Sequence, residues 1–258
     1  MAQDRATFSA TLALLARKGV RYATVIDLGC ADGHFFVQHR PLFAGGVPVN
    51  IDANALYEPS LKLVKETLGG HYRIAAVSDQ PGEVTITLAA HPYWSSLRGS
   101  GDPYWQRLNG MTSGQRTVPA IRLDDLAREL DLKPPYLLKL DIQGAEVQAL
   151  RGARDVLGKT HVVICEADLD DFQAINAELV ASGFRLHDLT QLSYASDQTL
   201  GWFYPVYINE SLAHLVSRAF WREASNEAVV KAQIERRTSI LAQLGVELRR
   251  IKASGGNG

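Results

Sequence analysis

The hydrophobic positions of this chain alternate between strand-like runs and helical stripes from about residue 6 to residue 210. Apolar runs rich in leucine and β-branched residues occupy residues 23–29, 47–52, 72–79, 136–141 and 161–166, and each carries an acidic residue at or near its end. Runs of this kind are typical of strands buried on both faces of a parallel sheet. The pattern therefore predicts a central sheet of parallel strands.

Helical periodicity fills the spaces between these runs. We expect helices at 6–18, 58–68, 145–158 and 171–182, and a further helix after the loop at 29–33. We also expect a short strand and helix within 117–130, a hairpin around 84–88, and two late strands at 184–189 and 202–209. Strands that alternate with helices over this length predict an α/β fold: a doubly wound sheet with helices on both faces. Residues 91–115 show no sustained periodicity, and we expect a long surface excursion there.

The chain changes character beyond about residue 211, where only helical periodicity is left. Apolar positions follow an alternating four-three spacing at Val230, Ile234, Leu241, Leu244, Leu248 and Ile251, with Arg237 in the same series. This spacing fits packing on the main body and self-association as a homodimer equally well. We expect an α/β domain at 1–210, a helical extension at 211–252 and a flexible tail at 253–258.

Composition and charge limit the classes of partner that this chain is expected to bind. It has 258 residues, with 27 Lys and Arg against 28 Asp and Glu, and a net charge of -1. Without a basic field, nucleic acid and anionic membranes are not expected as partners. The first residues fit neither a signal peptide nor a membrane span, so we expect a cytoplasmic protein. Cys30 and Cys165 are expected to be buried, reduced thiols, and alone they cannot form a zinc site.

Acidic residues at strand ends are the first chemical signal. In doubly wound sheets, ligands bind at the carboxyl ends of the strands. The five acids at those ends are Asp27, Asp52, Asp79, Asp141 and Glu166. A single strand-end Asp is more often a turn former or helix cap, but five in series concentrate negative charge unless a cationic or hydrogen-bonding group lies at that edge.

The glycine loop after the first strand narrows the choice of ligand. In "VIDLGCADGHFF", Gly29 and Gly33 allow backbone to approach a ligand closely. The dinucleotide fingerprint needs a further Gly where this chain has His34. The carboxylate of Asp27 would repel a diphosphate and attract a cationic amino group, such as that of S-adenosylmethionine. Asp52 is then placed to accept the ribose hydroxyls.

Two motifs resemble those of a known family. "VIDLGCADGHFF" resembles the first motif of class I S-adenosylmethionine-dependent methyltransferases, and "LLKLDIQGAEVQALRGA" resembles the signature of the FkbM family within that class. "AAVSDQPGEVTI", "WSSL" and "IRLDDL" are similar to further family segments, so the likeness covers about residues 20–170. The departures are Gln143, where the family usually carries Glu, and the long C-terminal helix.

The resemblance implies a Rossmann-like seven-stranded methyltransferase sheet whose last strand is antiparallel, with S-adenosylmethionine over the ends of its first four strands. It assigns cofactor-binding roles to Asp27, Gly29, Cys30 and Gly33 in the first loop, Asp52 at the ribose, Ser78 and Asp79 near the adenine, and Asp141 beside the methyl group. It also implies O-methylation of a hydroxyl on a sugar, glycoconjugate or other small metabolite. No motif names the acceptor.

Methylation of an alcohol requires a base, and the sequence offers three candidates. Asp141 is the best placed, Glu166 is second, and His91 lies in the long loop. Asp141 and Glu166 could share a proton or bind a divalent metal, although the acids of "EADLDD" are explained more simply by a helix start. Aromatic residues of the long loop, Tyr93, Trp94, Tyr104 and Trp105, suggest an acceptor-binding lid. Trp202 is expected to pack among the late strands.

Two alternative functions fit the same fold. A nicotinamide-dependent oxidoreductase would use this sheet topology, but the missing Gly and the carboxylate of Asp27 oppose it. A non-catalytic protein that binds S-adenosylmethionine could use the C-terminal helix to recruit partners. The presence of the expected site residues argues against a loss of catalytic activity; these residues are Gly29, Gly33, Asp52 and Asp141.

Overall fold

The structure is a computed structural model that describes residues 7–43, 45–91, 95–98, 112–216 and 227–254. The chain forms two compact units, Met1–Leu215 and Val216–Gly258. Within the described ranges, no helix combines the length and the apolar character that crossing a membrane requires.

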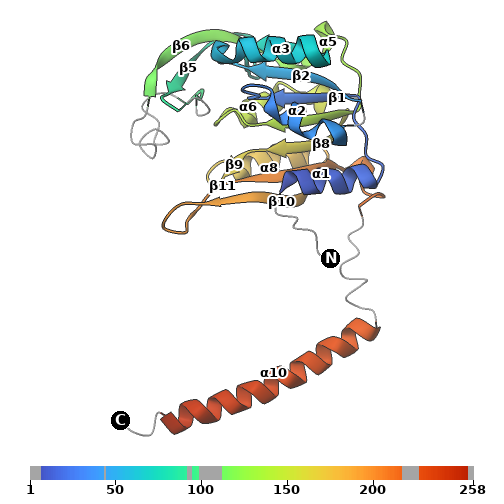
Figure 1. Ribbon diagram of the computed structural model, residues 1–258, viewed down its shortest axis with the longest axis vertical. Helices are drawn as coiled ribbons and strands as arrows, with labels where there is room; N and C mark the ends of the chain where they lie inside the picture. The colour runs from blue at the N-terminus through green and yellow to red at the C-terminus, as the bar shows by residue number, and fades with distance from the viewer. Residues whose placement is uncertain (1–6, 44, 92–94, 99–111, 217–226, 255–258) are drawn as a thin grey trace. The chain divides into compact units, whose positions relative to one another are not determined.

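The first unit alternates strands and helices, and the second contains one long helix (Figure 1). The strands are β1 (Thr24–Leu28), β2 (Val47–Asp52), β3 (His71–Ile74), β4 (Ala76–Val77), β5 (Gly82–Ala89), β6 (Thr112–Ile121), β7 (Tyr136–Leu140), β8 (Thr160–Cys165), β9 (Ala167–Asp168), β10 (Phe184–Tyr194) and β11 (Leu200–Asn209). The helices are α1 (Phe8–Arg17), α2 (His34–His39), α3 (Glu58–Leu68), α5 (Leu123–Glu129), α6 (Glu146–Arg151), α7 (Arg154–Leu157), α8 (Phe172–Ala181) and α10 (Glu227–Ser254), with short 3-10 turns η1 (Arg40–Leu42), η2 (Ala55–Tyr57) and η3 (Glu210–Leu212).

The central sheet has the strand order β10-β11-β8-β7-β1-β2-β3. The strands from β3 across to β8 pair in parallel, whereas β11 runs antiparallel to both β8 and β10. The short strand β9 also pairs with β11. The expected doubly wound sheet with an antiparallel last strand is confirmed, and β9 is added to it.

Helices cover both faces of this sheet (Figure 1). The larger core joins one face to α5, α6, α7 and α8, and its residues include Leu126, Leu150 and Leu179. On the other face, α1 and α2 pack their aromatic rings together, with the centroids of Phe8 and Phe35 5.8 Å apart. Burial on both faces explains why the central strands are continuously apolar.

The expected strand at 72–79 is wrong in one respect, because it is two strands in different sheets. β3 pairs with β2 in the central sheet, and β4 pairs with β6 in a second sheet of order β4-β6-β5. Ala75 lies between them and donates its N–H to the carbonyl of Asp52. The chain therefore leaves the central sheet at Ala75, before the acidic residue that was expected at its edge.

The expected helix at 145–158 is also divided, into α6 and α7. At Gly152 an added Cβ would lie 2.1 Å from the carbonyl oxygen of Ser78, so this backbone packs directly on the chain that follows β4. The carbonyl of Gly152 accepts the N–H of Asp124, whose carboxylate accepts the N–H of Val156. These tertiary hydrogen bonds replace those of a continuous helix.

Two β-hairpins are longer than the sequence pattern predicts. β6 begins at Thr112, inside the expected excursion, because it pairs with β5 over most of its length. β10 continues to Tyr194 and pairs with β11 through several register shifts. Many side chains of these extensions are exposed, so their hydrophobic alternation is weak.

Gly29 fixes how closely β1 and β7 approach at their ends. It has φ +71°, and a Cβ on it would lie 1.9 Å from the backbone oxygen of Asp141. The contact is with backbone, so a small side-chain movement cannot relieve it. Gly29 is therefore required by the packing of the chain on itself.

We predict that Gly29→Ala lowers the free energy of unfolding by at least about 2 kcal/mol, because it adds a backbone clash to the strain of a positive φ. Gly19→Ala is the matched control, since Gly19 has φ +92° but no atom within 4 Å of an added Cβ. Its expected cost is about 1 kcal/mol. Urea denaturation measures both, and equal losses would contradict the clash.

Glu146 holds the turn between β7 and α6. Its two carboxylate oxygens accept the N–H groups of Ile142 and Gly144, at 3.2 and 2.8 Å. The side chain is buried, and burial raises the pKa of Glu146 to about 7. The residue is therefore an anchor for the loop that follows Asp141.

A raised pKa in the folded state means that Glu146 contributes most stability below its unfolded pKa, and that this contribution is lost as the pH rises towards 7. We predict that the stability of the wild type relative to Glu146→Gln falls by on the order of 3 kcal/mol between pH 4.5 and 7. Denaturation at a series of pH values measures it. Glu178→Gln should show the opposite slope, because the hydrogen bond from Arg151 lowers the pKa of Glu178. Parallel curves for wild type and Glu146→Gln would refute the prediction.

Candidate functional site

A cavity of about 960 Å³ lies at the carboxyl ends of the central strands. Of the cofactor-binding and catalytic residues expected from the sequence, those that line it are Asp27, Gly29, Cys30, Asp52, Asp141 and Glu166. They come from four neighbouring strands, because parallel strands bring their ends to one edge of the sheet. Residues far apart in the chain are thereby gathered around one volume.

Four other candidates in the described part of the chain do not line this cavity: Gly33, Ser78, Asp79 and His91. Gly33 begins α2, and a Cβ on it would be 3.3 Å from side chains of α3, so close packing accounts for it. Ser78 follows β4 and packs its carbonyl against Gly152. Ala75, Ala76 and Val77, just before Ser78, line the cavity instead.

A buried lysine balances the acids at the floor of the cavity. Lys139 on β7 stands directly opposite Asp27 on β1 in the parallel register. Its ammonium donates to Oδ1 of Asp27 at 3.2 Å and to Oδ2 of Asp141 at 3.1 Å. Although burial alone would lower the pKa of Lys139, the carboxylates of Asp141 and Asp27 raise it above its usual value. The lysine is therefore a permanent cation between two acids.

Asp27 has an unused acceptor. Its side chain is fully buried, and its Oδ2 has no hydrogen-bond partner among the described residues. Burial raises the pKa of Asp27 to about 6, against the opposing effect of Lys139. At neutral pH the carboxylate is therefore mostly ionised, and its unpaired oxygen offers an acceptor at the cavity.

Asp52 organises the backbone on either side of it. Its oxygens accept the N–H groups of Ala31 at 2.9 Å and of Asn54 at 2.8 Å. Burial raises the pKa of Asp52, while these two hydrogen bonds act in the opposite direction. A carboxylate has about four acceptor sites, so Asp52 retains the capacity to accept further hydroxyl groups.

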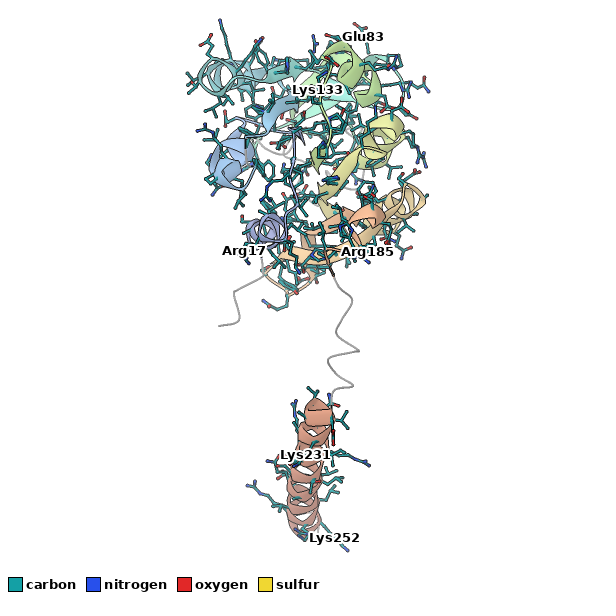
Figure 2. The ribbon with its side chains drawn as sticks, turned by 90° about the vertical axis from the view of Figure 1, so that its right-hand side faces the viewer. Arg17, Glu83, Lys133, Arg185, Lys231 and Lys252 are labelled. Atoms are coloured by element: carbon teal, nitrogen blue, oxygen red, sulfur yellow. The ribbon has the colours of Figure 1, made fainter. Side chains whose placement is uncertain are left out.

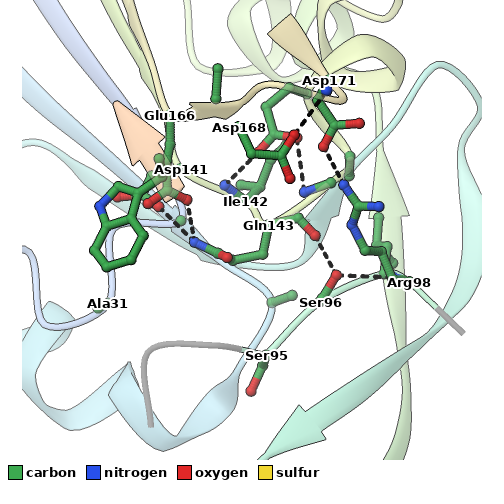
Figure 3. Close-up of a pocket in the computed structure, with 18 of the residues that line it drawn as sticks. Ala31, Ser95, Ser96, Arg98, Asp141, Ile142, Gln143, Glu166, Asp168 and Asp171 are labelled. Atoms are coloured by element: carbon green, nitrogen blue, oxygen red, sulfur yellow. Dashed lines mark hydrogen bonds and ion pairs between the residues drawn. The ribbon is translucent and has the colours of Figure 1, made fainter. Parts of the chain in front are cut away.

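Asp141 and Glu166 form a carboxylate pair with two shared partners. The amide of Gln143 donates to Oδ1 of Asp141 at 3.1 Å and to Oε2 of Glu166. The hydroxyl oxygen of Tyr204 lies 2.9 Å from Oδ2 of Asp141 and 3.3 Å from Oε1 of Glu166. Figure 3 shows Gln143 reaching towards both acids from the loop after β7.

The two acids differ in charge. Burial works against ionisation of Asp141, but its interactions with Lys139, Glu166 and Tyr204 outweigh burial and lower its pKa. Burial and the neighbouring charge of Asp141 raise the pKa of Glu166 well above its usual value. Asp141 therefore ionises before Glu166, which holds its proton more tightly.

A short segment after β5 forms another wall of the cavity. The hydroxyl of Ser96 donates to the carbonyl of Gln143, and Arg98 forms an ion pair with Asp171 at the start of α8 (Figure 3). A Cβ on Gly144 would lie 2.2 Å from Nε of Arg98, so the glycine makes room for this arginine. The segment is thus fastened to the loop that follows Asp141.

The outer part of the cavity is more apolar. Trp202 lines it and is 47% exposed, and Leu169 lines it and is 56% exposed. The expectation that Trp202 packs among the late strands is therefore wrong: its ring lies at the cavity wall because β11 pairs with β9 beside the site. The aromatic residues proposed for a lid, Tyr93, Trp94, Tyr104 and Trp105, lie outside the described residues.

Neither cysteine forms a disulfide bond. Cys30 and Cys165 are both buried and free, and burial raises the pKa of each thiol. In the part of the chain that the structure describes, no three His, Cys, Asp or Glu side chains form a group that could hold a metal ion.

Sequence reasoning missed two residues of the site, Lys139 and Tyr204. A lone Lys inside the apolar run "YLLKLD" is unusual and lies two residues from Asp141, so it could have been recognised as a same-face neighbour. Tyr204 carries no such signal. It reaches the acids only because β11 inserts between β8 and β10.

A sequence model described as the methyltransferase FkbM domain matches residues 27–186. No curated protein matches the sequence. Similar solved structures include a precorrin-6y C5,15-methyltransferase from Geobacter metallireducens (12% identity, 77% of this chain and 83% of that one, TM-score 0.40) and a putative O-methyltransferase from Klebsiella pneumoniae (11%, 81% and 81%, 0.43).

A third similar structure is the magnesium protoporphyrin IX methyltransferase of Synechocystis with bound S-adenosylmethionine (10% identity, 78% of this chain and 79% of that one, TM-score 0.41). The match to the domain spans more than half of the 258 residues and includes the strand-end acids of the cavity. This chain therefore belongs to the FkbM family of methyltransferases.

Proposed function

We propose that this protein transfers a methyl group from S-adenosylmethionine to a hydroxyl of a small-molecule acceptor. The observation that carries the proposal is the row of strand-end carboxylates, Asp27, Asp52 and Asp141, along one cavity in a methyltransferase domain. Membership of this family favours methyl transfer over the nicotinamide-dependent alternative.

The residues present fit the proposed cofactor. The unpaired Oδ2 of Asp27 suits the ammonium of the methionine part, and the remaining acceptor sites of Asp52 suit the ribose hydroxyls. Ala75 to Val77 offer an apolar surface for the adenine. A volume of about 960 Å³ also leaves room for a second molecule beside the cofactor.

S-adenosylmethionine supplies, when bound, an electrophilic methyl group. The protein must then orient the acceptor and remove the proton of its hydroxyl. Asp141 is the proposed base, because its pKa is lowered and because Lys139 and Tyr204 both contact its Oδ2 and leave Oδ1 to the Gln143 amide. Glu166 is a weaker candidate, because burial and the neighbouring charge of Asp141 raise its pKa. His91 stays a third candidate, outside the cavity as described.

A sugar or glycoconjugate is the acceptor that we propose. Trp202 and Leu169 provide an apolar platform, and a ring with one apolar face can rest on such a surface. Asp170 and Asp171 at the same wall are acceptors for hydroxyl groups. Among the described residues that line the cavity, the cations Lys139 and Arg98 are engaged with carboxylates, which favours an uncharged acceptor over a phosphorylated one.

We predict that Asp52→Ala weakens the binding of S-adenosylmethionine by about 10- to 100-fold, because hydrogen bonds to a charged acceptor are lost. Asp141→Asn should bind the cofactor as the wild type does, yet lose about 100-fold or more in methyl transfer. Calorimetry measures binding. Radiolabelled cofactor with a small-molecule extract of the source organism measures transfer.

The control is Asp125→Ala, a change at a half-exposed residue of α5 that should alter neither quantity. Absence of binding by the folded wild type, or unchanged binding in Asp52→Ala, would count against the proposal. Thermal stabilisation by NAD but not by S-adenosylmethionine would favour the oxidoreductase. Binding without transfer to any component of the extract would favour a non-catalytic role.

We also propose that the protein forms a homodimer through α10. Val230, Ile234, Leu241, Leu244 and Leu248 follow one seam of this helix and are each 40 to 60% exposed. Figure 2 shows side chains projecting along the helix from Lys231 to Lys252. In a parallel pairing, Glu247 of one helix would face Lys252 of the other, five residues on. Arg237 is the one charged residue in this series.

We predict that deletion of residues 224–258 converts a dimer into a monomer, with the mass in light scattering halved. Leu244→Asp should have the same effect, because it places a charge in the seam. Val246→Asp is the matched control: Val246 is 58% exposed on the same helix but lies off the seam. A full-length chain that is already monomeric would refute the proposal.

A further inference from the structure

Asp141 and Glu166 come from neighbouring parallel strands and are brought together by the ladder between them. The N–H of Glu166 donates to the carbonyl of Leu140 at 2.8 Å, which continues the pairing of β7 and β8 beyond their ends. β11 lies on the far side of β8 and runs antiparallel to it, so Tyr204 enters from the opposite direction. Three strands thus place a phenol beside two carboxyl groups.

The supply of protons in this cluster is limited. A phenol has a single O–H, so Tyr204 can donate to only one of its two carboxyl neighbours. The shorter contact, 2.9 Å, is to Asp141, which also receives the ammonium of Lys139 on the same Oδ2. The oxygen of Tyr204 lies 3.3 Å from Oε1 of Glu166, where it can share its own O–H or accept a hydrogen bond from a protonated Glu166. A proton on Glu166 would give each of the two contacts its own donor.

We propose that Tyr204 is a positioning residue that joins Asp141 and Glu166 into one unit holding a single proton. Glu166 carries this proton and donates to the oxygen of Tyr204, whose own hydroxyl donates to the ionised Asp141. Gln143 bridges the same two carboxyl groups from the other side. The charge stays on Asp141, because Lys139 contacts that acid.

The surrounding charges support this distribution. The groups facing the pair are Lys139 on β7, Asp27 on β1, Asp52 on β2, Glu146 on α6 and Cys165 on β8. Glu146, when ionised, repels a negative charge at Glu166, and Lys139 stabilises the charge at Asp141. Consistent with this, the pKa of Asp141 is lowered and that of Glu166 is raised.

The inference has a consequence that rests on the proposed function. If Asp141 accepts the proton of the acceptor, Tyr204 leaves its Oδ1 available by occupying Oδ2. Glu166 then serves to hold Tyr204 in place and does not act as a second base. The single proton itself needs neither cofactor nor acceptor, so it can be tested without them.

Infrared difference spectroscopy of the full chain across a pH series follows the carbonyl stretch of protonated carboxyl groups. We expect a carboxylic acid band in the wild type that persists above pH 7 and is absent in Glu166→Gln. In Tyr204→Phe the ionised Asp141 loses a donor, so the lower midpoint of the pair should rise by about one pH unit, a tenfold change in proton affinity.

Tyr207→Phe is the matched control. Tyr207 lies on the same strand and is fully buried, and its hydroxyl donates to Asn176 at 3.3 Å, away from the acids. It should leave both midpoints unchanged. Gln143→Met removes the other bridging donor without altering β11 and should shift the lower midpoint in the same direction as Tyr204→Phe.

Two results would overturn the inference: no band assignable to Glu166 at neutral pH, or a Tyr204→Phe titration that matches those of wild type and Tyr207→Phe. Because the samples contain no S-adenosylmethionine, these results are separate from failure of the proposed function, which the calorimetry reports. Unfolding midpoints of the variants show that each remains folded during the titration.

Discussion

The ammonium of Lys139, buried between the carboxylates of Asp27 and Asp141, is the interaction on which the rest of this site depends. Two ionised acids at the ends of adjacent strands repel each other strongly when they are removed from water. A cation in register between them makes the arrangement stable and leaves the oxygen Oδ2 of Asp27 without a partner among the described residues. The site can therefore be rigid while still offering an acceptor.

The loop after β7 is held in place from several directions. Glu146 accepts its backbone N–H groups from inside, Ser96 donates to the carbonyl of Gln143, and Gly144 makes room for Arg98. Gln143 has φ +56°, a left-handed conformation that the neighbouring hydrogen bonds support. A Glu at this position would add another carboxyl group beside Asp141 and Glu166. The amide instead donates to both of them.

The cavity has two halves of different origin. The half assigned to the cofactor is built from the ends of β1, β2 and β7, where the sheet register alone fixes the positions of the side chains. The outer half is built from residues 95–98, the segment after β9 and the hairpin between β10 and β11. These segments are loops and edge strands, which vary most among proteins of one fold. The outer half is therefore the part that can adapt to a particular acceptor.

Much of the architecture was determined by the sequence itself. Continuous apolar runs predict parallel strands that are buried on both faces, and this local pattern can be recognised without knowing what the strands pack against. The class of sheet could therefore be predicted from the sequence. So could the gathering of four acids at one edge of it: Asp27, Asp52, Asp141 and Glu166. The FkbM motif identified the family because it is one continuous stretch of sequence, which forms a strand, a turn and a helix.

Only the tertiary structure decided where those patterns end and what lies beside them. The expected strand breaks at Ala75 and the expected helix breaks at Gly152 because of hydrogen bonds and contacts between distant segments. The local hydrophobic pattern contains no information about such contacts. Because the chain leaves the central sheet at Ala75, Asp79 is away from the cavity that its position in the sequence suggested. Tyr204 meets Asp141 across 63 residues because β11 inserts beside β8, and such long-range pairing is set by topology.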